Sequence, residues 1–189
     1  MTAVGVLALQ GAFLEHARAL QACGCRPVEV RKPEQLDDCR ALIIPGGEST
    51  AIGKLMDEFG LFESVRRFGA GGRPIFGTCA GMVLLAREIE GSEQPRLGLM
   101  DIAVKRNAFG RQVDSFEADV LVPVLGEKPV RGVFIRAPYV TAVGRGVETL
   151  AVFDGKVVLV GQDKFLAGAF HPELTTDTRL HQYFLRFLD

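Results

Sequence analysis

The sequence has almost no net charge and no concentrated basic segment. Its 22 lysines and arginines nearly balance 23 aspartates and glutamates, which leaves a formal net charge of -1. Nucleic acids and anionic membranes attract proteins through clustered positive charge. We therefore expect neither a nucleic acid nor a membrane as a partner.

Long apolar runs are also absent. No stretch approaches the roughly 18 residues that a membrane-crossing helix needs. The apolar N-terminal segment has no lysine or arginine ahead of it and ends at Gln10, which favours a buried strand over a signal peptide. The expected class is a soluble globular protein of the cytoplasm.

Cysteines are few and do not indicate disulfides. They are Cys23, Cys25, Cys39 and Cys79. A chain of 189 residues buries enough surface to fold without disulfides, so we expect free thiols. The spacing of Cys23 and Cys25 fits no redox motif and indicates packing residues. No cluster of His, Cys, Asp and Glu has metal-ligand spacing, so no metal and no other cofactor is expected.

The first half of the chain alternates apolar strands with helical patterns. Crossovers of this kind predict a parallel sheet with helices on both faces. The predicted strands are 4–9, 27–30, 41–45 and 74–77, and the predicted helices are 13–23, 50–60, 61–69 and 80 to about 90.

The second half is richer in strands. Asp154-Gly155 between two apolar runs predicts a hairpin over 148–161. Further strands are predicted at 100–104, 117–124, 132–138 and 165–170, and a last helix at 178–188. The whole chain, 1–189, is expected to form one three-layer α/β domain, with a mostly parallel central sheet and an antiparallel portion in the second half.

One cysteine stands at a junction of strand and helix. Cys79 lies in "FGTCAG", between Gly77 and Gly81. A strand-turn-helix with flanking glycines is the elbow that lifts a nucleophile above a sheet. The following helix start, at Ala80, offers free N–H groups that favour a thiolate and can face an oxyanion.

A thiolate nucleophile needs a base, and the sequence holds three histidines. His16 and His181 lie within predicted helices, which indicates positions on a helix surface or at the edge of the core. His171 instead follows a strand, at the sheet edge where sites of open α/β folds assemble. Glu173 lies two residues further on, a spacing that puts both side chains on one side of an extended segment. His171 is therefore the predicted base and Glu173 the group that orients it.

A glycine pair follows another buried strand in "IIPGGEST". Gly46-Gly47 allows the backbone to approach a ligand closely, and Ser49 or Thr50 is expected to cap the next helix. A phosphate-binding loop is excluded because the glycine spacing is one residue too long and Leu55 follows Lys54. A backbone donor for an oxyanion is the favoured interpretation.

Together these residues resemble the class I (triad) glutamine amidotransferases, whose fold is flavodoxin-like. The closer resemblance is to the glutaminase subunits of pyridoxal 5′-phosphate synthase. It is carried by the blocks "GVLALQGAFLEH", "PGGEST", "FGTCAGMVLLA", "RNAFGRQVDSFEAD", "GVFIRAP" and "FHPELT" and covers nearly the whole chain. Ala108 departs from the serine expected in the fourth block, without bearing on catalysis.

The resemblance implies a reaction and a site. Cys79 attacks the carboxamide of glutamine, His171 transfers the proton and Glu173 orients His171, through a glutamyl thioester. Backbone N–H groups near Gly47 and Ala80 stabilise the oxyanion. The residues implied to line the glutamine site are Gly47, Glu48, Ser49, Arg106, Ile135 and Arg136, and Gln10 is expected at the same edge.

The resemblance also implies a partner. A separate synthase subunit, in a hetero-oligomeric complex, uses the ammonia to make pyridoxal 5′-phosphate, and the chain has no room for a second catalytic domain. We expect weak activity alone, with the partner completing the oxyanion hole. Three alternatives remain open: the glutaminase subunit of another ammonia-dependent synthase, a γ-glutamyl hydrolase, and a non-catalytic regulatory partner.

Overall fold

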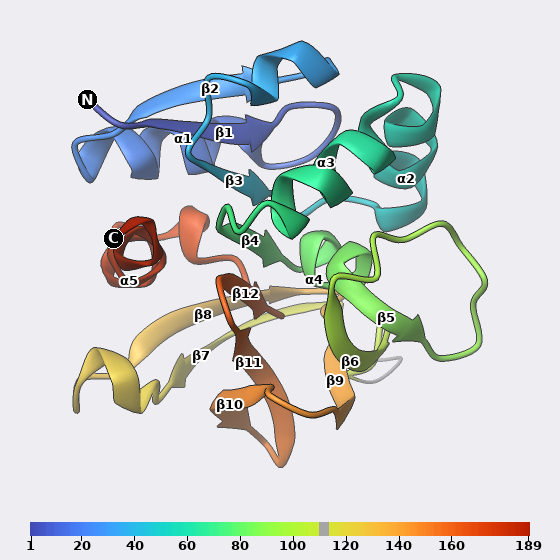
Figure 1. Cartoon of the computed structure of the whole chain (residues 1–189). Helices are drawn as coiled ribbons and strands as arrows, with labels where there is room; N and C mark the ends of the chain where they lie inside the picture. Colours follow the sequence, from blue (N-terminus) through green and yellow to red (C-terminus); the bar gives the residue numbers. More distant parts are fainter. Residues whose placement is uncertain (110–113) are drawn as a thin grey trace.

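The computed structural model describes residues 1–109 and 114–189, and a mixed ten-stranded sheet runs through its centre (Figure 1). The strand order is β2-β1-β3-β4-β12-β11-β9-β6-β5, with β10 paired to β11. Residues 110–113 of the block "RNAFGRQVDSFEAD" lie outside the described residues. No helix in the described ranges is long and apolar enough to cross a membrane.

The first half of the chain forms the parallel side of this sheet, as predicted. Neighbouring strands run parallel from β2 through β1, β3 and β4 to β12. β3 and β4 are buried along their whole length, which is why they are continuous apolar runs. The elements are β1 (Ala3–Leu7), α1 (Phe13–Ala22), β2 (Arg26–Val30), η1 (Pro33–Leu36), β3 (Ala41–Ile44), α2 (Ser49–Glu58), α3 (Leu61–Ala70) and β4 (Ile75–Thr78).

Helices cover both faces of the sheet, and two adjacent residues of β4 show how. Ile75 lies against Gly69 of α3 on one face. Phe76 points to the other face, where its ring centroid lies 5.5 Å from that of Phe184 in α5 (Arg179–Leu185) and 6.3 Å from that of His16 in α1. Because side chains alternate along a strand, the apolar residues of β4 pack against the helices on both faces of the sheet.

The predicted helix from Ala80 to about residue 90 is wrong in its second half. Helix α4 (Ala80–Leu85) ends after six residues, and the chain continues as strand β5 (Ala86–Ile89). Ala86 takes an extended conformation with φ -63° and ψ 144°, and β5 pairs in parallel with β6. Sheet pairing thus overrides a helical pattern that the sequence alone favours.

The second half forms the antiparallel side and a separate two-stranded sheet. Asp154 and Gly155 have φ 48° and 69°, which confirms the hairpin. The strand predicted to reach residue 124 ends at Val120, because Pro123 begins a 3-10 turn, η2 (Pro123–Leu125). The strands are β6 (Met100–Lys105), β7 (Ser115–Val120), β8 (Val130–Ile135), β9 (Tyr139–Val143, not predicted), β10 (Glu148–Phe153), β11 (Lys156–Gln162) and β12 (Phe165–Gly168).

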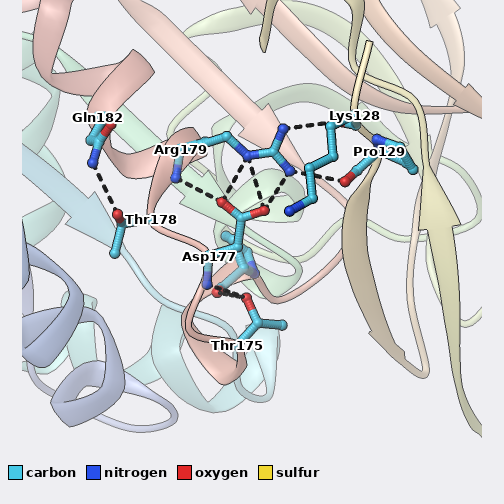
Figure 2. A network of polar contacts seen from close by, with 8 residues as sticks. Lys128, Pro129, Thr175, Asp177, Thr178, Arg179 and Gln182 are labelled. Atoms are coloured by element: carbon cyan, nitrogen blue, oxygen red, sulfur yellow. Dashed lines mark hydrogen bonds and ion pairs between the residues drawn. The ribbon is translucent and has the colours of Figure 1, made fainter. Parts of the chain in front are cut away.

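The last helix, α5, is fixed at its N-terminal end by a polar network (Figure 2). The guanidinium of Arg179 donates to the carbonyl oxygens of Lys128 and Pro129 at 2.8 and 2.9 Å. The same group donates to both carboxylate oxygens of Asp177, at 2.6 to 3.1 Å. Helix α5, which a final turn η4 (Arg186–Leu188) extends, is therefore tied to the segment that leads into β8.

Candidate active site

Cys79 lies at a strained elbow between β4 and α4, as predicted. Its φ of 49° and ψ of -102° are unusual for a residue with a side chain. A Cβ on Gly77 would lie 2.5 Å from the carbonyl carbon of Gly81, and a Cβ on Gly81 would lie 2.1 Å from the carbonyl oxygen of Ile44. Both flanking glycines are therefore required by close backbone contacts. The Cys79 N–H donates to the Gly168 carbonyl oxygen at 2.8 Å and fixes the elbow to β12.

His171 and Glu173 meet beside this elbow, just beyond the carboxyl end of β12. The His171 N–H donates to the Val133 carbonyl oxygen of β8 at 2.8 Å. His171 Nδ1 lies 2.7 Å from Glu173 Oε1. The pairing is as predicted but its local geometry is not, because residues Pro172–Leu174 form a 3-10 turn, η3, rather than an extended segment. The turn brings the carboxylate to the Nδ1 edge of the ring.

The electrostatics of the pair favour a charged histidine. Burial opposes the imidazolium, but hydrogen bonds to Cys79 and Glu173 and their negative charge raise the pKa of His171 to about 10. Burial alone would raise the pKa of Glu173, yet the charges of His16 and His171 and the hydrogen bond from His171 lower it. An imidazolium beside the Cys79 sulfur stabilises the thiolate, the nucleophilic form of a cysteine.

A cleft of about 310 Å³ opens over Cys79 and His171. It brings together residues from segments that lie far apart in the sequence. Every residue proposed from the sequence to bind glutamine or the oxyanion lines it: Gly47, Glu48, Ser49, Ala80, Arg106, Ile135 and Arg136, together with Gln10. Gly46 of the predicted glycine pair lines it too, and the structure adds Gly11, Ala12, Val83, Asn107, Pro138 and Leu174.

Arg106 is held by a residue that sequence reasoning missed. Its guanidinium donates to Gln94 Oε1 at 2.6 Å, and it lies 3.4 Å from Ser49 Oγ. Gln94 sits in the loop between β5 and β6, where no pattern distinguishes it from other polar loop residues. The contact aims a positive charge at the cleft without neutralising it.

The loop after β3 is tied to the loop after β1. The Ala12 N–H donates to the Gly46 carbonyl oxygen at 3.0 Å, and the Glu48 N–H donates to Gln10 Oε1 at 2.8 Å. A Cβ on Gly46 would lie 2.2 Å from His171 Cε1, so only glycine lets this loop pass beside the histidine.

The residue that caps α2 is Glu48, so the predicted cap by Ser49 or Thr50 is wrong. Its carboxylate accepts from the backbone N–H groups of Thr50 and Ala51, at 3.3 and 2.8 Å, and from the Thr50 hydroxyl. A hydrogen-bonding carboxylate is one of the groups that stabilise a helix N-terminus. The capping contacts leave Glu48 at the edge of the cleft, with its pKa lowered: burial opposes the shift, and the bonds from Thr50 and Ala51 outweigh it.

Backbone strain gathers around the cleft. Three of its lining residues, Cys79, Asn107 and Arg136, have positive φ values of 49°, 48° and 43°. The other non-glycine residues of the described chain with positive φ, Asp154 and Asp163, lie in the turns that follow β10 and β11. Such conformations persist where the surroundings fix them, and they are frequent at functional sites.

The expectation for His16 and His181 is wrong. Neither is at a helix surface, because both are fully buried. His16 Nδ1 lies 2.9 Å from His181 Nε2, and His16 Nε2 lies 3.0 Å from Thr78 Oγ1. His16 Nε2 also lies 3.4 Å from Glu173 Oε2. Both histidines thus lie directly behind the predicted catalytic residues.

The four cysteines are free thiols, as predicted. Cys25 and Cys39 are buried and Cys23 is half-buried. In the described part of the chain no group of three or more His, Cys, Asp and Glu residues is arranged to hold a metal ion.

Comparisons with known proteins place this site in a family context. The model of the SNO glutamine amidotransferase family matches residues 6–189. The chain is 77% identical, over the full length of both, to "Pyridoxal 5′-phosphate synthase subunit PdxT" of Desulforudis audaxviator. It is 68% identical to the protein of the same name from Pelotomaculum thermopropionicum, over 96% of this chain and 93% of that one.

Solved structures agree in fold. A protein described as a glutamine amidotransferase superposes with a TM-score of 0.93 at 55% identity, over 98% of both chains. A structure described as PurLQS from Thermotoga maritima superposes with a TM-score of 0.73 at 19% identity, over 100% of this chain and 99% of that chain. The second similarity concerns the fold alone.

Proposed function

This chain belongs to the SNO glutamine amidotransferase family, and we propose that it hydrolyses L-glutamine to glutamate and ammonia as the glutaminase subunit of a pyridoxal 5′-phosphate synthase. Two relatives that it matches over 100% and 93% of their own length carry the name of that subunit. We propose further that residues 1–189 act as one glutaminase domain in the cytoplasm. The observation that carries the proposal is Cys79 at a strained elbow, in one cleft with His171, which is hydrogen-bonded to Glu173.

In the proposed reaction His171 takes the proton of the Cys79 thiol, which leaves the thiolate beside an imidazolium. The Cys79 thiolate attacks the side-chain carboxamide carbon, and the carbonyl oxygen becomes an oxyanion. His171 then donates its proton to the leaving nitrogen, which departs as ammonia and leaves a glutamyl thioester. A water molecule, deprotonated by His171, cleaves the thioester to glutamate and restores the thiolate.

Glutamine binding is assigned to the wall of the cleft. We assign Arg106 to the α-carboxylate, because a guanidinium forms charge-assisted and bidentate contacts with that group. Gln94 supports this role by holding the guanidinium from behind at 2.6 Å. Glu48, with its lowered pKa, suits the α-ammonium of the substrate. Gly47, Ser49, Ile135 and Arg136 complete the proposed pocket.

The oxyanion hole is assigned to the backbone N–H groups of Gly47 and Ala80. In the free chain the Gly46 carbonyl oxygen is held by the Ala12 N–H, so turning the Gly46-Gly47 peptide breaks that hydrogen bond. We propose that docking of the synthase subunit supplies the energy for this turn. The free glutaminase is then weakly active, and ammonia is released only where the partner can take it up.

The test is to combine the purified chain with glutamine, the sugar phosphate substrates and the synthase subunit, following glutamate and the cofactor chromophore together. We expect glutamate release to rise strongly when the synthase subunit is added. Equal turnover with and without it would refute the gating by the partner. A γ-glutamyl peptide in place of glutamine is the matched substrate control, and its preferential hydrolysis would refute the function itself.

A further inference from the structure

A buried chain of polar side chains lies behind the proposed triad, on the side away from the cleft. It runs from His181 of α5 to His16 of α1 and on to Thr78 and Glu173. The side chains of His16 and Glu173 are 0% exposed. Neither His16 nor His181 lines the cleft, so the chain can reach glutamine only through Glu173 and His171 or through Thr78 and Cys79.

Hydrogen-bond geometry selects one arrangement of protons in this chain. Among the described residues His181 Nδ1 has no hydrogen-bond partner. An unpaired N–H in the core costs more than an unpaired acceptor on a weakly solvated ring nitrogen, so the His181 proton belongs on Nε2. His181 Nε2 then donates to His16 Nδ1 across 2.9 Å.

That arrangement fixes His16 in turn. With Nδ1 accepting, a neutral His16 carries its proton on Nε2, which faces both Thr78 Oγ1 at 3.0 Å and Glu173 Oε2 at 3.4 Å. The reverse tautomer would point a lone pair at a carboxylate. Glu173 Oε2 has no other partner in the described structure. Its charge therefore favours an N–H at this position, and the long contact is of the kind that shortens when the reacting complex forms.

Building on the triad roles proposed above, we propose that His16, oriented by His181, is a positioning residue for the glutaminase reaction. Its Nε2–H stabilises the second oxygen of the Glu173 carboxylate while the first oxygen holds the ring of His171. The carboxylate is thus fixed from both sides. Thr78 shares the same N–H and immediately precedes Cys79, which ties the contact to the nucleophile as well.

The position of His181 is itself enforced by the fold. The Asp177–Arg179 network with Lys128 and Pro129 holds the start of α5 (Figure 2). His181 follows two residues later. The rings of Phe76 and His181 lie in edge contact at 6.0 Å, which limits rotation of the imidazole.

Charges around the two histidines support a neutral pair. Burial lowers the pKa of His16, and His171 lowers it further, against the opposing charges of Glu173 and Glu15. Burial and the neighbouring His16 lower the pKa of His181 to about 3. The titratable groups facing this pair are thus Glu173, His171 and Glu15. At neutral pH both imidazoles stay neutral, and the charges of these groups act on the orientation of the two N–H groups.

Two matched amide substitutions separate positioning from packing. In His16→Gln the carboxamide reaches the place of Nε2 and can donate to Glu173. In His16→Asn it reaches only the place of Nδ1 and can bond only to His181. In complex with the synthase subunit, we expect kcat of the Asn variant to fall on the order of 10- to 100-fold, the range for a hydrogen bond to a charged group. The Gln variant keeps a higher kcat than the Asn variant, and KM for glutamine stays unchanged in both.

The thiol provides a second readout. Alkylation of Cys79 by iodoacetamide is followed by mass spectrometry of its peptide, because Cys23 is the more exposed thiol and reacts as well. We expect the pH profile of alkylation to move to higher pH in His16→Asn and to move less in His16→Gln. Equal kcat and equal profiles in the wild type and both folded variants would overturn the proposal, as would a higher kcat in the Asn variant.

A measurement on the unaltered protein decides the matter even if neither variant folds. Ring nitrogen-15 shifts in the wild-type complex are expected to show the Nε2–H tautomer at both His16 and His181. The Nδ1–H tautomer at His16 would overturn the proposal. If the wild-type complex released no glutamate, the proposed function would fail instead, while the tautomers and the alkylation profile would still test the network.

Discussion

The candidate site has a closed back and an open front. Behind Glu173, the side chains of Thr78, His16 and His181 are fully buried and joined by contacts of 2.9 to 3.4 Å. In front, Glu48 and Arg136 are exposed at the rim of the cleft. The groups proposed to do chemistry are fixed from inside, whereas Glu48 and Arg136, proposed to bind the substrate, stand in contact with water.

This difference separates two tasks. Catalytic groups gain from being held in place before the substrate arrives, because no reorganisation is then needed during reaction. A substrate-binding wall must admit and release its ligand. The loop of Gly46 and Gly47 lies between both regions, against His171 on one side and tied to Gln10 and Ala12 on the other. It is the part of the site best placed to respond to a partner.

The largest expected effect comes from removing the thiol. Cys79→Ala should lower glutamate release in the complex by at least about 10⁴-fold, the scale seen when a nucleophile of a triad is lost. Glutamate is measured with the synthase subunit present. Cys39→Ala, which removes another buried free thiol, is the control and should leave turnover near that of the wild type.

The next largest effect is expected from Glu173→Gln, a substitution at the closed back of the site. The amide has the same shape but no charge, and it can present its NH₂ to His171. We expect kcat to fall on the order of 10³- to 10⁴-fold, as for loss of the orienting carboxylate in a triad, with little change in KM. A rise in KM of similar size would instead place Glu173 among the substrate-binding groups at the front. The nitrogen-15 titration of the ring should also show the His171 pKa well below its value of about 10.

The front is tested by Arg106. Arg106→Ala should raise KM for glutamine on the order of 10- to 100-fold, because a charge-assisted hydrogen bond is lost, while kcat changes less. Arg106→Lys keeps the charge but not the planar fork and should lie between the two. Steady-state kinetics of the complex give the split between KM and kcat. A loss confined to kcat would contradict the division between front and back.

The smallest expected effect is a pH dependence of the free energy of unfolding, caused by a buried histidine behind Glu173. The pKa of His181 is about 3 in the folded chain and 6.5 as its ordinary value, so between these values the unfolded chain binds a proton that the folded chain does not. The free energy of unfolding should therefore fall as pH falls from about 6.5, by roughly 1.4 kcal/mol per pH unit for each such proton. Urea unfolding at pH 7 and pH 5 measures the slope.

His181→Phe should reduce that slope by about one proton. Arg18→Gln, an exposed change on the helix that carries His16, is the matched control and should leave the slope unchanged. A slope that persists in His181→Phe would assign the acid sensitivity to other groups.

Most of the parallel half and the meeting of Cys79 with His171 could be predicted from the sequence, whereas the glutamine-binding residues of the front came from the family resemblance. Apolar runs such as Ala41–Ile44 and Ile75–Thr78 are buried on both faces, and glycines lie at or just beyond their carboxyl ends. Cys79 and His171 each follow such a strand, and parallel strands bring their carboxyl ends to one edge. Local patterns therefore carried the information on which side chains meet there.

The back could not be predicted in the same way. His16 and His181 lie 165 residues apart, each on a helix whose pattern shows nothing unusual at that position. Only the packing of α1 and α5 on the Phe76 face of the sheet brings them together. The short α4 fails for a related reason, since the pairing of β5 with β6 is a long-range contact that no local propensity encodes.

The span between His16 and His181 has a consequence for the timing of activation. During synthesis Cys79 leaves the ribosome after His16 but long before His171, Glu173 and His181, so neither its proposed base nor the last member of the buried chain is present at first. The nascent chain thus carries an ordinary thiol, less exposed to oxidation and to stray electrophiles than an activated one. We therefore expect reactivity only once the segment from His171 to the end of α5 has folded into place, so that a molecule that has not finished folding releases no ammonia.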